Sequence, residues 1–369
     1  MALFAAGRIG KLDLPNRIVM APLGRGRNEP ASREPLGRSA IYYRQRATAG
    51  LIISEATHVA LDSVSRPGTG AIHAEAQAAA WKRVTEAVHE EGGRIFQQLF
   101  HLGRKADPDR LPGRLAPVAP SAVAAAGSVT GVDGAQKPFP TPRPLDAAGI
   151  AAVRGQFAQA FAHARAAGFD GIELHAANGF LIEQFLRDDA NLRDDDYGGP
   201  VENRARLLLE LVDAAIALLG ADAVGVRISP HFAVDGPGTS DPGSLYPYVA
   251  RQLGQRGIAY LHVIEPDGTP DARKLAPLLK EAFGGPFILA GEFTRDSALR
   301  AVSEGRADFV AFGRLYIANP DLVARFRRPD APLNVPEEKS FYEGGDQGYI
   351  DYPALDAALP GAGDPALAR

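Results

Sequence analysis

Short apolar runs alternate with segments of helical period along most of the chain. The runs are nearly continuous in apolar residues, which is typical of strands buried on both faces of a parallel sheet. Eight strands are expected, at residues 17–23, 50–56, 94–100, 168–177, 223–230, 258–266, 286–293 and 307–314. The clearest helical segments between them lie at 75–91, 146–167, 201–219, 244–255, 271–283 and 295–304. A strand–helix order repeated eight times predicts an α/β fold, the closed (β/α)₈ TIM barrel.

An open doubly wound sheet is the alternative architecture. It has less support, because no Gly-x-Gly-x-x-Gly opens a helix after any expected strand. We therefore expect a single barrel domain over residues 1–369, with an insertion at about 101–145 after strand 3 and a frayed tail at about 355–369. An insertion of this length usually forms a lid or a small hairpin over a site.

Composition and charge exclude several classes of protein. The chain is 46% hydrophobic and 23% charged, and its net charge of −4 gives no basic excess for binding nucleic acid. It has no cysteine, which excludes disulfides, thiolate zinc sites and cysteine-ligated iron–sulfur clusters. Its first residues lack the order of a signal peptide, and no apolar run approaches the roughly 20 residues that span a bilayer. We expect a soluble, cytoplasmic protein with no nucleic-acid or membrane partner.

The barrel fold predicts that the active site is built at the carboxyl ends of the strands. These ends are polar and rich in glycine, with few carboxylates. No lysine ends a strand, which disfavours a Schiff-base aldolase. The first strand carries no His-x-His, which disfavours a metal-dependent hydrolase, so no metal site is expected.

His175 and Asn178 follow one of the expected strands, where it gives way to a helix. A spacing of three residues would present both side chains on one face of a helical turn, where both could point at one oxygen of a ligand. The alternative is that His175 caps the strand and Asn178 is a helix N-cap. The spacing alone leaves both interpretations open.

Strands seven and eight end in Gly291 and in Gly313-Arg314. Glycine lets backbone N–H groups approach a phosphate, a guanidinium can pair with it, and barrels commonly bind phosphate at this point. The alternative is that these glycines only form tight turns. We favour the phosphate site.

Several longer motifs together resemble the old yellow enzyme family of FMN-dependent oxidoreductases. The resemblance covers about residues 3–355, and the motifs follow the order of the family. They are MAPLGR at 20–25, YRQRA at 43–47, QLFH at 98–101, HAANG at 175–179, DYGGPVENR at 196–204, FGR at 312–314, ANPDL at 318–322 and GYIDYP at 348–353.

The resemblance implies one non-covalent FMN across the barrel mouth. Gln98 would hydrogen-bond the pyrimidine edge of the flavin, and Arg227 would stabilise the negative charge of the reduced flavin. A structural ion pair inside the barrel is the alternative role for Arg227. Gly291, Gly313 and Arg314 would hold the phosphate. The remaining cofactor contacts would come from Pro22, Leu23, Gly24 and Ala56.

The implied activity is that of an ene-reductase. NADPH or NADH would reduce the FMN, and an activated alkene (an enone, enal, nitroalkene or maleimide) would then take the hydride at its β-carbon. His175 and Asn178 would donate hydrogen bonds to the carbonyl or nitro oxygen, in the manner of an oxyanion hole. Phe100, Arg66 and Tyr342 would line the substrate pocket. The small-molecule partner would thus be an activated alkene or a nitro compound, and the protein would be a monomer or a homodimer.

Phe180 is the first departure from the family, which usually has tyrosine at this position as the acid that protonates the α-carbon. Phenylalanine has no proton to give, and general-acid catalysis typically contributes about 10²–10⁴-fold. Water, Tyr316 or Tyr342 are candidate substitutes. Alternatively, the protein is a double-bond isomerase, a nitroreductase or a dehydrogenase on the same scaffold, or a ligand-binding barrel without turnover.

Gly24 and Arg66 are two further departures. The family commonly has threonine or cysteine at position 24, where it bonds the flavin O4, so glycine is expected to alter the flavin potential. Many relatives have an aromatic residue at the position of Ser65-Arg66. An arginine there would suit an acidic substrate, or it is a solvated loop residue.

Overall fold

A closed barrel of eight parallel strands forms the centre of the computed structural model, which describes residues 1–64, 66–233, 235–266, 268–270 and 274–355. Each strand pairs with the next in chain order, β15 pairs with β3, and β6 pairs with β11 across the insertion. The barrel strands are β3 (Ile18–Met20), β4 (Leu51–Ile53), β6 (Ile95–Phe100), β11 (Gly171–Ala176), β12 (Val224–Ile228), β13 (Tyr260–Ile264), β14 (Phe287–Ala290) and β15 (Phe309–Phe312). All eight lie within the predicted runs, and the predicted fold class is confirmed.

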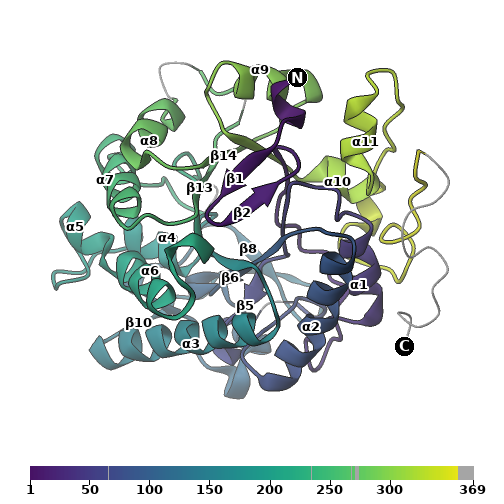
Figure 1. Ribbon diagram of the computed structural model, residues 1–369. Coiled ribbons are helices and arrows are strands. Elements are labelled where there is room, and N and C mark those ends of the chain that lie inside the picture. Colours follow the sequence, from purple (N-terminus) through teal and green to yellow (C-terminus); the bar gives the residue numbers. More distant parts are fainter. Residues whose placement is uncertain (65, 234, 267, 271–273, 356–369) are drawn as a thin grey trace.

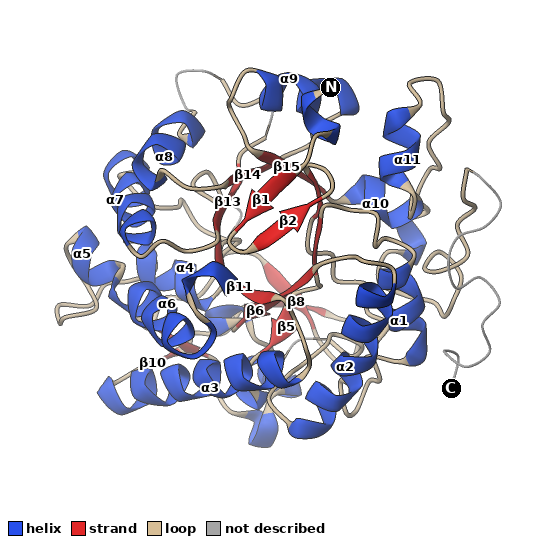
Figure 2. Ribbon diagram, viewed as in Figure 1, coloured by secondary structure: helices blue, strands red, loops and turns tan. Residues whose placement is uncertain are grey.

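Helices surround the barrel on its outside (Figure 2). They are α1 (Gly37–Arg44), α2 (Glu75–Glu90), α3 (Ala147–Ala166), α4 (Leu181–Leu186), α5 (Val201–Arg204), α6 (Arg206–Leu219), α7 (Pro242–Gln255), α8 (Ala276–Phe283), α9 (Arg295–Ser303), α10 (Arg314–Ala318) and α11 (Leu322–Arg327). Side chains that point outward from the strands pack against these helices in one large apolar core. The barrel therefore has two cores, one around it and one inside it.

Two predicted helices differ from the structure. The helix expected at 201–219 is two helices, because the chain turns at Ala205 between α5 and α6. The helix expected at 271–283 begins at Ala276, where the Glu265 carboxylate accepts hydrogen bonds from the backbone N–H groups of Leu275 and Ala276. Residues 271–273 of that prediction lie outside the described residues.

An N-terminal hairpin, β1 (Gly7–Ile9) and β2 (Leu12–Leu14), lies across the amino-terminal mouth of the barrel (Figure 1). Ile9 and Leu14 belong to the inner apolar core together with Tyr260 and Phe309, the first residues of their strands. The sequence analysis missed this hairpin, because its two strands have three residues each and no distinctive period. The hairpin covers one mouth of the barrel, so ligands reach the interior from the other.

The insertion follows β6, as predicted. It contains the short helical turn Gly103–Lys105 and a hairpin of β8 (Ser128–Thr130) and β9 (Gln136–Pro138), while β7 (Val118–Ala119) pairs with β10 (Arg143–Pro144). The insertion is tied to the barrel loops, since the N–H of Ala126 donates to the carbonyl of Asp235 at 3.0 Å.

The chain after α11 returns to the barrel and packs on α1. The ring of Tyr349 stacks on Tyr42 at 4.2 Å, and the Arg25 guanidinium donates to the Gly348 carbonyl at 2.7 Å. The frayed tail expected from about residue 355 lies almost wholly outside the described residues. Within the described part of the chain, no helix combines the length and apolar character needed to cross a bilayer.

Candidate active site

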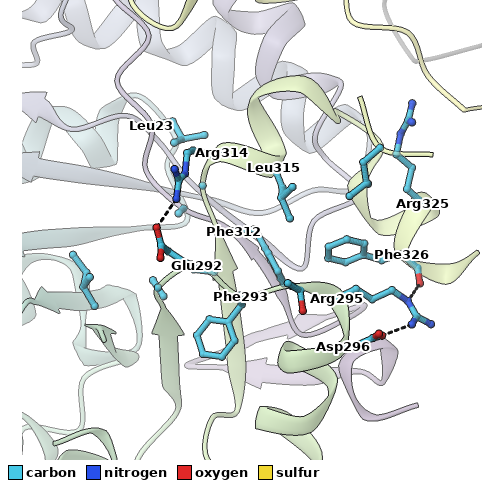
Figure 3. A pocket seen from close by; sticks show the side chains of 18 of the residues that line it. Leu23, Glu292, Phe293, Arg295, Asp296, Phe312, Arg314, Leu315, Arg325 and Phe326 are labelled. Atoms are coloured by element: carbon cyan, nitrogen blue, oxygen red, sulfur yellow. Dashed lines mark hydrogen bonds and ion pairs between the residues drawn. The ribbon is translucent and has the colours of Figure 1, made fainter. Parts of the chain in front are cut away.

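A cavity of about 820 Å³ opens at the carboxyl ends of five barrel strands (Figure 3). Its walls come from the ends of β3, β12, β13, β14 and β15 and from the segment around α11. Six of the predicted cofactor residues line it, namely Pro22, Leu23, Arg227, Gly291, Gly313 and Arg314. The structure therefore brings together residues that are more than 290 positions apart in the sequence.

The other three predicted cofactor residues are not among those that line the cavity. Gly24 is exposed just after β3, and a Cβ there would meet nothing within 4 Å. Ala56 packs against the apolar cluster that contains Phe100. Gln98 is buried inside the barrel. Gly24 thus leaves open space where a larger side chain would stand.

Gly291 lets the floor of the cavity come close to the neighbouring strand. Its φ of 147° lies outside the range that other residues readily adopt, and a Cβ there would lie 2.3 Å from the Glu265 carbonyl oxygen. Any larger residue would push β14 away from β13. This glycine is therefore required for the close packing of the strand ends at the site.

Arg314 is paired with Glu292 at the rim of the cavity (Figure 3), at 2.6 Å between Nη2 and Oε1. Both side chains are 69% exposed, so the pair is weak and an incoming anion can displace the carboxylate. Sequence analysis did not single out Glu292. Its carboxylate lies where the resemblance implies a phosphate, and it would compete with that phosphate for Arg314.

Arg227 lines the cavity at the barrel mouth, and at least one of its N–H donors has no partner. Its buried Nε atom has no hydrogen-bond partner, and no described carboxylate lies within ion-pair distance of its guanidinium. No contact ion pair of Arg227 is found among the described residues, although burial lowers its pKa and the Glu173 carboxylate, which interacts electrostatically with it, opposes that shift. A buried unpaired donor is costly, so this arginine favours a ligand with an acceptor or negative charge at the cavity floor.

A hydrogen-bonded chain crosses the barrel interior beside Arg227. Gln98 Nε2 donates to Glu173 Oε1 at 2.6 Å, and His262 Nδ1 lies 2.8 Å from Glu173 Oε2. Burial raises the pKa of Glu173, but His262, Arg227 and Gln98 together hold it below its ordinary value. The carboxylate thus fixes the orientation of the Gln98 amide, whose oxygen and second N–H remain for a ligand.

His175 lies on β11, directly beside Arg227 on β12. It is 3% exposed, and its buried Nδ1 has no hydrogen-bond partner. Burial, and after it the charge of Arg227, lowers the pKa of His175 well below its ordinary value. The imidazole is therefore neutral near pH 7, and it can donate one hydrogen bond without adding charge to the site.

Asn178 lies in a turn, and the prediction that it shares a helical turn with His175 is wrong. β11 ends at Ala176, and α4 begins only at Leu181 with Phe180 as its N-cap residue. The φ of 59° at Asn178 is left-handed, a conformation that asparagine tolerates better than most residues. Asn178 is therefore not the helix N-cap either.

Buried side chains hold the Asn178 turn in place. The Ser229 hydroxyl accepts from the Asn178 N–H at 2.8 Å and donates to Glu183 Oε1 at 2.6 Å. Glu183 Oε2 accepts from the Gly179 N–H at 2.5 Å. Burial raises the pKa of Glu183 to about 7, although these donors favour its charged form.

Aromatic rings form the wall next to His175. The ring of Phe180 lies 4.9 Å from His175 and 5.0 Å from Phe100, both edge to face. Arg66 and Tyr342, also expected in the substrate pocket, are exposed, and the Arg66 guanidinium lies 3.9 Å from the centre of the Tyr342 ring. The structure thus joins Phe100 to the inner wall and places the Arg66–Tyr342 pair on the surface.

Sequence reasoning missed several residues of this site. Glu173 lies two positions before His175 on β11, so strand alternation could have placed the two on the same side. Ser229 lies two positions after Arg227, just beyond the end of β12. Lys105 lies in the insertion, and its Nζ donates to the carbonyl of Asn178 at 3.1 Å. No sequence signal points to that contact.

The residues at the mouth fit a flat cofactor that carries a phosphate, such as FMN. The cavity has a glycine-lined floor, the Arg314 guanidinium at its rim and, inside, Arg227 with a buried Nε that has no hydrogen-bond partner. An oriented amide and a neutral imidazole lie on the adjoining side. Together these groups are typical of a barrel enzyme that binds a redox cofactor and a substrate side by side at its mouth.

The sequence profile of the NADH:flavin oxidoreductase / NADH oxidase family matches residues 2–330. A Leishmania infantum protein named "Probable flavin mononucleotide-dependent alkene reductase" is 41% identical over 352 residues, covering 94% of this chain and 96% of the relative. The old yellow enzyme homologue from Zymomonas mobilis is 40% identical with a TM-score of 0.91, covering 96% and 99%. Morphinone reductase in complex with tetrahydroNAD is 44% identical with a TM-score of 0.91, covering 96% and 98%.

The chain belongs to the NADH:flavin oxidoreductase / NADH oxidase family, and its resemblance to the old yellow enzymes is confirmed. It is an FMN-dependent oxidoreductase of that family.

Proposed function

We propose that the protein is an ene-reductase that uses NADPH or NADH to reduce the double bond of an activated alkene. The observation that carries this proposal is the neutral, buried His175 beside Arg227, whose buried Nε has no hydrogen-bond partner, at the mouth of an FMN-family barrel. The relative named "Probable flavin mononucleotide-dependent alkene reductase" and the morphinone reductase solved in complex with tetrahydroNAD support the same activity.

The cofactor would be held by the residues that line the mouth. Gly291, Gly313 and Arg314 would bind its phosphate, while Arg227 and Gln98 would face the isoalloxazine, with Pro22, Leu23, Gly24 and Ala56 around its edge. Bound FMN supplies hydride transfer, which amino-acid side chains cannot provide. The protein contributes orientation and charge: Arg227 favours the anionic reduced form, and Glu173 fixes the amide of Gln98.

His175 and Asn178 would polarise the substrate. Negative charge grows on the carbonyl or nitro oxygen as the β-carbon is reduced, and donors that are already oriented stabilise that charge. The lowered pKa of His175 keeps the imidazole neutral, so it acts as a hydrogen-bond donor and not as a fixed charge. The aromatic wall of Phe100 and Phe180 favours an apolar, small-molecule alkene such as a cyclic enone.

A product assay tests this proposal. The purified protein, reconstituted with FMN, is incubated without oxygen with NADPH and 2-cyclohexenone, and the products are identified by mass. We expect one cyclohexanone for each NADPH consumed. Substitution of both donors (His175→Ala with Asn178→Ala) should slow the reaction roughly 10²–10³-fold, as loss of oxyanion donors does elsewhere.

The same assay distinguishes the second candidate, which Phe180 favours because it carries no hydroxyl. If the enone is unchanged but a nitroaromatic compound is reduced, the protein is a nitroreductase. Conversion of the enone to an isomer without NADPH consumption would show an isomerase. Either result would overturn the ene-reductase proposal while leaving the FMN site intact.

A further inference from the structure

We propose that Lys105 is the general acid of this site, the group that supplies the α-carbon proton in place of a tyrosine hydroxyl at position 180. This inference rests on the proposed ene-reductase function. It concerns a residue of the insertion, for which neither the motifs nor the comparisons give a role.

The two tyrosines considered as substitutes lie in the wrong places. Tyr316 is fully buried in the core outside the barrel, where burial raises its pKa far above the ordinary value. Tyr342 is 49% exposed and is stacked with Arg66 on the surface. The ring contacts of Phe180 are instead with Phe100, His175 and Lys105.

Lys105 reaches the site from the turn Gly103–Lys105, directly after β6. Its Nζ lies 5.2 Å from the centre of the Phe180 ring and 5.3 Å from that of Phe232. It donates to the Asn178 carbonyl at 3.1 Å, which anchors the ammonium on the turn that carries one of the two proposed substrate donors. The side chain is only 18% exposed, so the ammonium is held within the site and is not extended into solvent.

Charged groups from several elements face this ammonium. Asp235, from the loop after β12, has its carboxylate oxygen 3.9 Å from Nζ, and Glu183 acts from α4. Arg104 of the insertion, Arg187 after α4 and His175 on β11 lie around the same point. Burial lowers the pKa of Lys105 from its ordinary value, while Asp235 and Glu183 oppose that shift. An ammonium with a lowered pKa is a better proton donor at neutral pH than an ordinary lysine.

The proposed step is a proton transfer that balances. Once the β-carbon has received the hydride, the substrate is an enolate whose oxygen His175 and Asn178 stabilise. The N–H bond of the Lys105 ammonium breaks, a C–H bond forms at the α-carbon, and the enolate charge is lost as the lysine becomes a neutral amine. Lys105 then takes a proton from solvent, and the nearby Asp235 favours its return to the charged form.

The alternative is that Lys105 only clamps the Asn178 turn. Two substitutions separate these roles. Lys105→Arg keeps a cation and donors for the Asn178 carbonyl, but a guanidinium stays protonated in proteins and is a poor acid. Lys105→Met removes both functions at similar size. A clamp predicts that the arginine variant works and the methionine variant fails, whereas an acid predicts that both fail.

The test follows the reoxidation of the reduced holoenzyme in a stopped-flow instrument with two acceptors. 2-Cyclohexenone needs a proton on carbon, whereas menadione is reduced to a hydroquinone and needs protons only on oxygen, which water supplies. We expect both variants to lose about 10²-fold or more with the enone and to stay within about twofold with menadione. Lys82→Met, on the exposed face of α2, is the matched control and should change neither rate.

Three further measurements make the assignment specific. Phe180→Tyr in the Lys105→Met background restores a hydroxyl at the site and should recover most of the enone rate. The wild-type enone rate should fall as the pH rises through the Lys105 pKa, which lies below 10.5. This decline in rate should be absent in Lys105→Met, whereas any pH dependence that comes from Glu183 should remain. Binding of p-chlorophenol to the oxidised flavin, followed by its absorption change, reports whether the pocket is intact without turnover.

The outcomes are decisive. An enone rate that is unchanged in Lys105→Met, or restored in Lys105→Arg, overturns the assignment. Equal losses with both acceptors, together with weakened phenol binding, show a clamp and also overturn it. If wild-type reduced enzyme reacts with menadione but not with the enone, the proposed ene-reductase function fails instead, independently of Lys105.

Discussion

Some residues at the barrel mouth are required for the backbone conformation that they allow and not for side-chain chemistry. Gly179 follows Asn178 with a φ of 75°, and a Cβ there would lie 2.0 Å from a carboxylate oxygen of Asp235. The glycine thus lets the buried carboxylate lie against the turn that carries Asn178. Sequence analysis found the Asn178-Gly179 pair by its motif but placed it on a helix, because a spacing of three residues cannot distinguish a helical turn from a left-handed turn.

Glu292 gives a prediction at the scale of one residue. Its carboxylate pairs with Arg314 and would be displaced by the phosphate of FMN. Glu292→Gln should therefore tighten FMN binding about two- to fivefold, since an exposed pair is worth roughly 0.2–1 kcal/mol. Quenching of FMN fluorescence by the apoprotein measures the affinity.

Glu304→Gln, which removes an exposed carboxylate at the C-terminal end of α9, serves as the control for net charge. The difference between Glu292→Gln and wild type should shrink at high salt, because ions screen exposed charges. Weaker FMN binding in Glu292→Gln would contradict the competition and would show that the carboxylate orients Arg314 toward the phosphate.

Whole elements were predictable where their pattern reflects burial. All eight barrel strands lie within the apolar runs, because a strand buried on both faces cannot carry many polar residues. The hairpin β1–β2 and the break between α5 and α6 were not predicted, since each depends on tertiary contacts with little local signal. Lys105 was missed for the same reason: its contact with Asn178 joins segments 73 positions apart through an irregular loop.

Glu183 on α4 leads to a prediction on pH and stability. Burial raises its pKa from 4.5 to about 7, so between these values the folded protein holds a proton that the unfolded chain has lost. Stability from this group is full below about pH 4.5 and declines as the pH rises toward 7. The shift corresponds to a loss on the order of 3 kcal/mol by pH 8.

Chemical denaturation of wild type and Glu183→Gln at pH 5 and pH 8 measures this effect. We expect the variant to lose less stability than wild type between the two pH values. Burial also raises the pKa of Glu55 to about 7. Glu55 should therefore contribute the same dependence of the unfolding free energy on pH in both proteins. An identical pH dependence in the two proteins would show that Glu183 does not carry the buried proton.

The cavity and the proposed site residues lie at one end of the barrel. The hairpin β1–β2 covers the amino-terminal mouth, while the cavity opens between the carboxyl ends of β3 and β12–β15. The insertion after β6 brings Lys105 to the same mouth, beside the turn that carries Asn178. The fold therefore brings together the residues proposed to bind the phosphate, the flavin and the substrate from segments spread over the described chain. A single domain remains our prediction for residues 1–369.

The central claim is that hydride enters this barrel from a nicotinamide and leaves to an activated alkene. An anaerobic absorption titration tests it most directly: NADPH is added to the FMN-loaded protein, followed by 2-cyclohexenone, while the oxidised-flavin band near roughly 450 nm is followed. We predict that NADPH bleaches the band and that the enone restores it with one equivalent per flavin. A band that bleaches but does not return with the enone would contradict the claim, and so would a protein that binds no FMN.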